Sequence, residues 1–169
     1  MTLKTFTTGE VLTADDTNVY LLNTIFARKT ATESVTSSTT LQDDDHLSVS
    51  VAASSVYELS CVLVYDGDAA GDVSIQWSFP SGASISWYLS SITGGGAAGT
   101  DDRIAYSAAA GPAALGCLGA GSTLAAHILG LVTVASTAGT FKLTWAQSVS
   151  NGTASRMFAG SYICLRRVF

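Results

Sequence analysis

Apolar and polar residues alternate with a period of two through most of the chain beyond residue 40, which is typical of half-buried β-strands. The alternation is regular in residues 47–51, 73–79, 85–89 and 141–146, and residues 162–169 close the chain as a last strand. Residues 56–65 are apolar on one face and carry valines on the other, so we expect that strand to be buried on both sides. About eight strands at this spacing predict an all-β fold, an antiparallel β-sandwich that is jelly-roll-like.

Residues that favour chain reversal separate these stretches. They are Asp66-Gly67-Asp68, Pro80-Ser81-Gly82, Ala138-Gly139 and Asn151-Gly152. The stretches 94–99 and 108–122 are too rich in glycine and alanine for regular strands, and we expect long loops there.

The first residues follow a different pattern, which predicts a short N-terminal helical arm. Thr13 can cap a helix and Asp16 stands at the matching capping-box position. Apolar residues then recur at helical spacing, and this stripe is the predicted docking surface: Val19, Leu22, Ile25 and Phe26. We therefore expect a docking arm over residues 1–29 with a helix at 14–26, a linker over 30–39, and a β-sandwich trimerisation domain over 40–169.

Composition changes this picture by favouring self-association. Hydrophobic residues make up 47% of the 169 residues and charged residues 12%, well below the roughly 25% charge of an average soluble protein. An oligomer can bury the excess apolar area between its subunits. We expect a homotrimer, with residues 56–65 near its threefold axis.

Charge excludes two classes of partner. The net charge is −5 and the eight basic residues are scattered, whereas phosphate binding needs a dense basic face, so we expect no nucleic acid. The uncharged run 104–141 contains Pro112 and several glycines, and its most apolar part, 127–134, is too short for a membrane helix. Residues 1–26 hold acidic side chains and lack the continuous apolar core of a signal peptide, so we expect no export by that route.

Two acidic stretches are candidates for metal binding, because clustered carboxylates are oxygen ligands for cations. We favour a solvated turn for Asp43-Asp44-Asp45-His46 and a hairpin turn for residues 66–72, and expect no bound metal. The cysteines, Cys61, Cys117 and Cys164, are odd in number and have no CxxC spacing, which favours buried thiols over disulfides or zinc.

No catalytic constellation is visible in the sequence. The histidines, His46 and His127, lie in no recognisable motif beside a serine or cysteine nucleophile, so we expect neither an enzyme nor a cofactor. Exposed aromatic residues can form a platform for carbohydrate, and the candidates for contact with a host-surface glycan are Trp87, Tyr88 and Tyr106.

The opening residues 5–23, TFTTGEVLTADDTNVYLLN, and residues 40–47, TLQDDDHL, resemble virion structural proteins of phages that infect actinobacteria. In those proteins an F-x-x-G-E-V-L-T-A start leads into a helix. Residues 138–148 and 160–167 are similar to the end of the same proteins. The resemblance implies a structural role without catalytic residues.

These observations together predict a homotrimeric structural protein on a virion surface, assembled in the host cytoplasm. We expect it to dock on the major capsid protein or another virion protein through the arm, as a capsid decoration or head-fibre protein. The alternative is a minor tail or receptor-binding protein that recognises host glycans.

Overall fold

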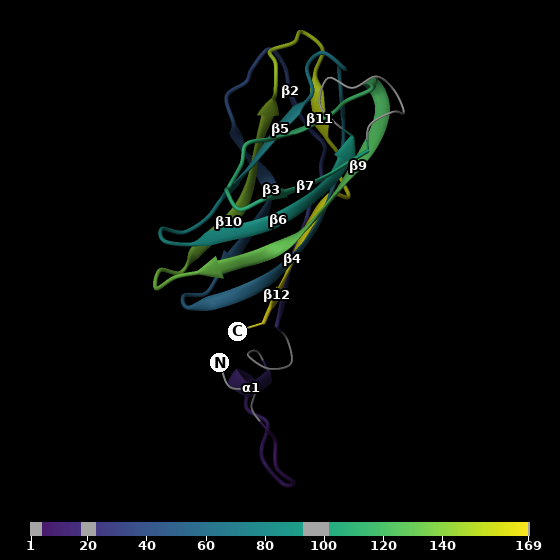
Figure 1. Ribbon diagram of the computed structural model, residues 1–169. Coiled ribbons are helices and arrows are strands. Elements are labelled where there is room, and N and C mark those ends of the chain that lie inside the picture. Colours follow the sequence, from purple (N-terminus) through teal and green to yellow (C-terminus); the bar gives the residue numbers. More distant parts are fainter. Residues whose placement is uncertain (1–4, 18–22, 93–101, 169) are drawn as a thin grey trace.

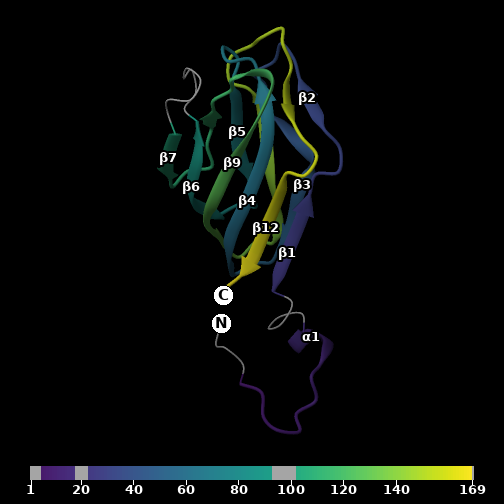
Figure 2. The same cartoon turned by 90° about the vertical axis from the view of Figure 1, so that its right-hand side faces the viewer.

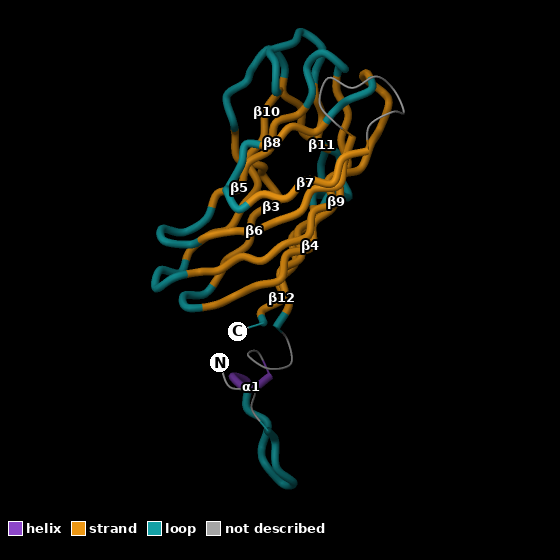
Figure 3. The backbone as a smooth tube through the Cα atoms, viewed as in Figure 1, coloured by secondary structure: helices purple, strands orange, loops and turns teal. Residues whose placement is uncertain are grey.

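The computed structural model describes residues 5–17, 23–92 and 102–168, and these form one helical turn and twelve strands (Figures 1 and 3). The helical turn is α1 (Ala14–Asp16). The strands are β1 (Thr24–Arg28), β2 (Glu33–Val35), β3 (Gln42–Val51), β4 (Ser55–Gly67), β5 (Val73–Ser78), β6 (Ser84–Ile92), β7 (Asp102–Ser107), β8 (Ala113–Leu115), β9 (Gly119–Val134), β10 (Gly139–Gln147), β11 (Ser155–Met157) and β12 (Tyr162–Arg167). Within the described residues, no helix is long and apolar enough to cross a membrane.

The strands form two antiparallel sheets that pack face to face. The larger sheet has the order β1-β12-β4-β9-β6-β7, with β11 and β2 joined at its side, and the smaller has the order β3-β10-β5-β8. Four pairs are nested along the chain, β3 with β10, β4 with β9, β5 with β8 and β6 with β7. This nesting is a long antiparallel ribbon rolled into a sandwich, which is the topology of a jelly roll. The predicted fold class is therefore confirmed for the body.

The core lies between the two sheets because every second residue of each strand points inward. Trp77 of the smaller sheet meets Trp87 of the larger sheet edge-on, with ring centroids 6.0 Å apart. Trp77 also stacks on Phe141 at 4.9 Å. All three side chains are almost completely buried, so the aromatic cluster joins the sheets at the centre of the sandwich.

Strand β4 corrects one expectation about burial. Its inward residues Tyr57, Leu59, Cys61, Leu63 and Tyr65 are buried, as the pattern predicts. The valines of the other face are only half-buried, because no described segment packs over the outer side of the larger sheet. The prediction of burial on both sides is wrong for the single chain.

The stretch 108–122 also differs from the expected loop. It contains the short strand β8, which pairs with β5, and the beginning of β9, where Gly119 lies opposite Gly67. Small side chains have little intrinsic preference for strands, but pairing with neighbouring strands outweighs that preference here. Residues 94–99 lie outside the described residues.

Two predicted reversals are confirmed as turns, but they join the sheets instead of forming hairpins. In the connection from β4 to β5, the backbone N–H of Gly71 donates to Asp68. Between β5 and β6, Ala83 donates to Pro80 and Gly82 has a φ of +77°, a conformation that glycine adopts readily. Asn151 and Gly152 likewise lie between strands of different sheets, β10 and β11.

The predicted helix over residues 14–26 forms one turn at Ala14–Asp16 and is wrong for residues 24–26, while residues 18–22 lie outside the described residues. The capping box forms as expected, since the Thr13 hydroxyl accepts from the Asp16 N–H at 3.1 Å and the Asp16 carboxylate accepts from the Thr13 N–H at 3.2 Å. Residues 24–28, however, form β1 and pair with β12. Ile25 faces the core and Phe26 faces outward. The positions of these two residues therefore fit the period of two of a strand as well as the period of a helix.

The domain boundaries move accordingly. Ile25 and Phe26 belong to the sandwich and form no helical stripe, while Val19 and Leu22 lie outside the described residues. The expected linker over 30–39 contains β2, which pairs with β11. The sandwich therefore begins at residue 24 instead of about residue 40. The extra strands find partners because β12 and β11 each offer a free edge.

Residues 5–17, which we call the N-terminal segment, lie beyond the end of the sandwich where β1 begins and β12 ends (Figures 1 and 2). Its apolar side chains Phe6, Val11 and Leu12 are exposed. Within the described residues, Val11 is 80% and Leu12 is 48% exposed.

Candidate functional site

The outer faces of the two sheets differ sharply in chemistry. The smaller sheet presents short polar or charged side chains: Ser48, Ser50, Ser74, Gln76, Ser78, Thr140, Lys142 and Thr144. The larger sheet presents large hydrophobic side chains that are between 38% and 59% exposed, here called the apolar face: Phe26, Tyr88, Tyr106, Leu129, Leu131 and Val168. The outer side of the smaller sheet is polar, whereas the outer side of the larger sheet exposes hydrophobic side chains.

Strand register brings the residues of the apolar face together. One row crosses six strands of the larger sheet, from β1 to β7. It consists of Phe26, Cys164, Ser60, Leu129, Tyr88 and Tyr106, each directly opposite the next. At one end of the row, Phe26 stacks on Tyr162 with centroids 5.5 Å apart. At the other end, the rings of Tyr88 and Tyr106 lie 5.1 Å apart. Neighbouring strands are about 4.8 Å apart, so the row spans roughly 24 Å.

A groove of about 690 Å³ lies on this face. Its walls are mostly hydrophobic, formed by Tyr88, Tyr106, Leu129, Leu131 and Val168, with Glu58 and Ser86 among the polar residues. The Glu58 carboxylate accepts from the Arg166 guanidinium at 2.8 Å, so this pair is balanced in charge.

Gly130 holds the groove strands close together. A Cβ at this position would lie 2.5 Å from the Ser86 carbonyl oxygen and 2.9 Å from the Cβ of Trp87. The glycine therefore lets β9 and β6 approach with the Trp87 side chain packed beneath them. This approach places Leu129 and Tyr88 side by side on the outer surface.

The three candidate glycan contacts are divided between the two sides of the larger sheet. Trp87 is 1% exposed and its indole N–H donates to the Ala109 carbonyl at 2.8 Å. Trp87 therefore cannot contact a glycan at the surface. Consecutive strand residues point to opposite faces, so Trp87 points into the core and Tyr88 points outward. Tyr88 and Tyr106 do lie together on the surface, and their contact with a glycan stays a prediction.

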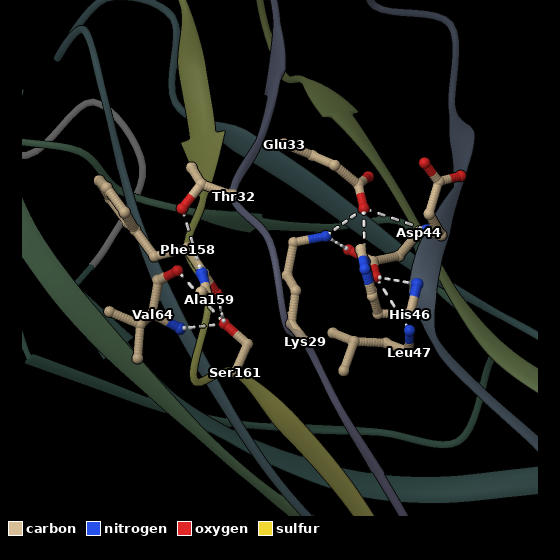
Figure 4. Close-up of polar contacts among 11 residues, drawn as sticks. Lys29, Thr32, Glu33, Asp44, His46, Leu47, Val64, Phe158, Ala159 and Ser161 are labelled. Atoms are coloured by element: carbon tan, nitrogen blue, oxygen red, sulfur yellow. Dashed lines mark hydrogen bonds and ion pairs between the residues drawn. The ribbon is translucent and has the colours of Figure 1, made fainter.

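The acidic stretch at 43–46 is not a solvated turn. It lies inside β3, and Asp44 is buried against Lys29, whose side chain is completely buried (Figure 4). The Lys29 ammonium donates to Asp44 at 2.7 Å and also to Glu33. The second oxygen of Asp44 accepts from the backbone N–H groups of His46 and Leu47 at 3.0 and 2.9 Å.

This cluster also contains a set of metal-ligand types. The side-chain donor atoms of Glu33, Asp44 and His46 lie within 4.8 Å of one another. The Lys29 ammonium, however, already binds both carboxylates, and a cation would have to displace it. We assign the cluster as an ionic clamp that ties the end of β1 to β2 and β3, and unchanged melting under chelators stays a prediction.

A second buried carboxylate lies at the end of β4. Asp66 accepts from Arg156 Nε at 2.8 Å and from the Gly121 N–H at 2.7 Å. Burial by itself raises the pKa of Asp66, but the hydrogen bonds from Arg156 and Gly121 and the charge of Arg156 outweigh it, so the pKa lies below its usual value. Asp66 therefore stabilises the folded chain in its ionised form.

The lowered pKa of Asp66 predicts a pH effect on stability. A carboxyl whose pKa is lower in the folded than in the unfolded chain, where it is about 3.9, stabilises the fold above that value, and this is lost as pH falls. Asp66→Asn should therefore lower the free energy of unfolding at pH 7, and the gap to the natural chain should shrink below about pH 4. Urea unfolding between pH 2 and 7 measures it, and a gap that stays constant down to pH 2 would contradict the role of Asp66.

The remaining candidates for nucleophilic chemistry are not assembled into a site. Burial, followed by the charge of Asp72, raises the pKa of Cys117 to about 12. Burial also raises the pKa of Cys61. Cys61 and Cys117 are buried, as predicted, whereas Cys164 is half-buried. His46 contacts Glu33 on the side of β3, and His127 is exposed on β9 of the other sheet.

No family model matches the chain, and no curated protein matches it. Two solved structures are weakly similar in shape. One is a chain of infectious bursal disease virus, Gx strain, with 11% identity, a TM-score of 0.27, and coverage of 85% of this chain and 35% of the other. The second is from the Gt strain of the same virus, with 9% identity, a TM-score of 0.23, and coverage of 85% and 40%. This chain thus spans well under half of their length, and matches at these TM-scores carry no argument. The resemblance to actinobacteriophage proteins stays a prediction.

Proposed function

We propose that this chain is a structural protein of a bacteriophage particle, a homotrimer that docks on the capsid surface through its N-terminal segment as a decoration or head-fibre protein. The observation that carries the proposal is the exposure of Phe6, Val11 and Leu12 on a segment that lies beyond the sandwich. Hydrophobic side chains presented in this way favour binding to another protein.

The segment is shaped by its own hydrogen bonds, which supports a docking role. The backbone N–H of Thr7 donates to the Glu10 carboxylate at 3.1 Å, and the Glu10 N–H donates back to the Thr7 carbonyl at 3.1 Å. The capping box at Thr13 and Asp16 holds the next turn. A segment that is already ordered loses less conformational entropy when it binds.

The jelly-roll body is compatible with this role. The fold recurs in viral capsid proteins, lectins and cupins, so a fold alone does not assign a function. Within the described residues, the structure brings no nucleophile together with a general base. A binding or scaffolding role is therefore better supported than catalysis.

Avidity makes a short segment sufficient for attachment. Fully burying a hydrophobic side chain is worth about 1.5–3 kcal/mol. Three segments on one trimer bind together, and the combined affinity can exceed a single contact by orders of magnitude when the geometry fits.

Removal of residues 1–22 should abolish attachment to particles and leave a folded trimer. The truncation leaves β1 in place, so the body keeps its sheet. Binding is measured by co-sedimentation of purified protein with particles that lack it. Retention of normal attachment by the truncated chain would overturn the docking role of the segment.

A pair of point variants separates hydrophobic docking from a general effect of charge. Val11→Asp should weaken attachment at least about tenfold, the equivalent of 1.4 kcal/mol, because Val11 is 80% exposed and free to enter a partner surface. Thr8→Asp adds the same charge at an exposed polar position and should change attachment little. Equal losses in both variants would show that charge, not hydrophobic contact, governs docking.

A second candidate function is a minor tail or receptor-binding protein. The observation that favours it is the exposed pair Tyr88 and Tyr106 beside the groove, because aromatic rings stack on sugars. In that case Tyr88→Ala would abolish binding of host oligosaccharide and leave assembly intact.

A further inference from the structure

We infer that the apolar face of the larger sheet is the subunit interface of the trimer, and that its occupant is a second copy of this chain. The inference rests on the proposed homotrimer and names the surface that builds it. It extends the expectation that residues 56–65 lie near the threefold axis to the outer face of the whole sheet.

The distribution of exposed hydrophobic side chains points to this face. Among the described residues outside the N-terminal segment, every exposed large hydrophobic side chain except Val149 lies on the apolar face. The outer face of the smaller sheet carries mainly Ser, Thr, Gln, Lys and Asp side chains. A contiguous hydrophobic patch rimmed by polar residues is typical of a protein interface.

The position of the face fits a cyclic trimer whose segments all reach one particle. Figure 2 looks onto the larger sheet, whose strands run along the long axis of the body, with the N-terminal segment beyond one end. Rotation about an axis parallel to these strands keeps all three segments at the same end. An interface on either end of the body would point them in different directions, so the interface has to be lateral.

The shape of the face suits a contact between two different parts of the same surface. Between Phe26 and Leu129 the row contains the small residues Cys164 and Ser60. They line a hollow of about 240 Å³ together with Thr24, Glu58 and Arg166. Tyr88 and Tyr106 stand at the far side of the same face. We infer that rings on one copy enter the hollow of the next. A head-to-tail contact of this kind closes into a ring when the rotation between neighbouring copies closes, as it does about a threefold axis.

The chemistry of the groove favours a protein over a carbohydrate. Leu129, Leu131 and Val168 are aliphatic and offer no partner for sugar hydroxyls, which lose hydrogen bonds to water when buried. Glu58 is already paired with Arg166. Aromatic and aliphatic side chains at a central patch with few charges are instead the composition of a subunit interface.

The test compares the molar mass in solution of the natural chain and of two variants. Each variant carries one new charge, on the outer face of the larger sheet or of the smaller sheet. The natural chain should scatter light as about three times 17.4 kDa, and Leu129→Asp as 17.4 kDa. Ser48→Asp places the same charge on the exposed outer face of the smaller sheet and should remain a trimer. Far-ultraviolet circular dichroism checks that each variant keeps its β-structure.

The native Cys164 provides a second readout that does not depend on a charged variant. It is half-buried in the hollow, whereas Cys61 and Cys117 are buried. In the trimer a neighbour should cover it, so a thiol reagent should label Cys164 at least about tenfold more slowly than in the Leu129→Asp monomer. Tenfold protection from reagent corresponds to about 1.4 kcal/mol.

The outcomes separate this inference from the proposed function. A natural chain that is a monomer at micromolar concentration overturns both the homotrimer and the interface. A trimer that persists in Leu129→Asp, with Cys164 equally reactive in the natural chain and the variant, overturns the interface alone. A monomer whose oligosaccharide binding is lost in Tyr88→Ala would assign the face to carbohydrate and overturn the inference.

Discussion

Lys29→Met is expected to lower the free energy of unfolding by about 3–5 kcal/mol, the usual cost of breaking a buried ion pair. The Lys29 ammonium is completely buried and binds the carboxylates of Glu33 and Asp44. Without it, two carboxylates remain close together and away from water. The backbone of Lys29 is held by hydrogen bonds with Ser161 and Gly160, so the chain cannot easily move to expose them. Urea denaturation at pH 7 measures the loss.

A matched control is available at the neighbouring carboxylate of β3. Lys142 pairs with Asp43 on the surface, where the side chains are 28% and 57% exposed. Lys142→Met should cost less than about 1 kcal/mol, because exposed ion pairs contribute little. If Lys29→Met costs no more than Lys142→Met, the buried cluster is not the clamp that joins β1, β2 and β3.

Trp77→Ala should also be strongly destabilising, by about 3–5 kcal/mol. Trp77 is 1% exposed and packs on both Trp87 and Phe141, so its removal leaves a cavity between the sheets. The measurement is the midpoint and slope of chemical denaturation, followed by the fluorescence of the remaining tryptophans.

The neighbouring position provides the control for Trp77. Gln76 lies on the same strand with its side chain on the outer face of the smaller sheet. Gln76→Ala should change the free energy of unfolding by no more than about 0.5 kcal/mol, the range of ordinary surface substitutions. Similar losses in the two variants would mean that β5 is placed with the wrong face toward the core.

The body of the fold could be predicted because a half-buried strand shows a regular alternation of apolar and polar residues. Residues 73–78 and 141–145 alternate without exception, and both face the core as expected. Residues 24–28 fit two patterns. Ile25 and Phe26 can belong to a hydrophobic stripe on a helix, or they can lie on opposite faces of a strand. Pairing with β12 decides between them, and no local pattern shows that partner.

The ionic clamp and the apolar face depend on contacts between distant residues. Lys29 and Asp44 are 15 positions apart, and the sequence pattern assigned them to a docking arm and a turn. Leu129 and Tyr88 each alternate with inward residues, so either one alone resembles an ordinary surface position. Only the register of β6, β9 and β4 shows that they form a continuous hydrophobic row.

We propose that three jelly-roll bodies stand on a phage particle with their N-terminal segments against it. Cryo-electron microscopy of intact particles that carry this chain would show this arrangement. We expect threefold density on the capsid exterior, with the larger sheets facing one another and residues 5–17 buried in the particle surface. Single, unassociated bodies, or density attached through the smaller sheet with the N-terminal segments in solvent, would contradict it.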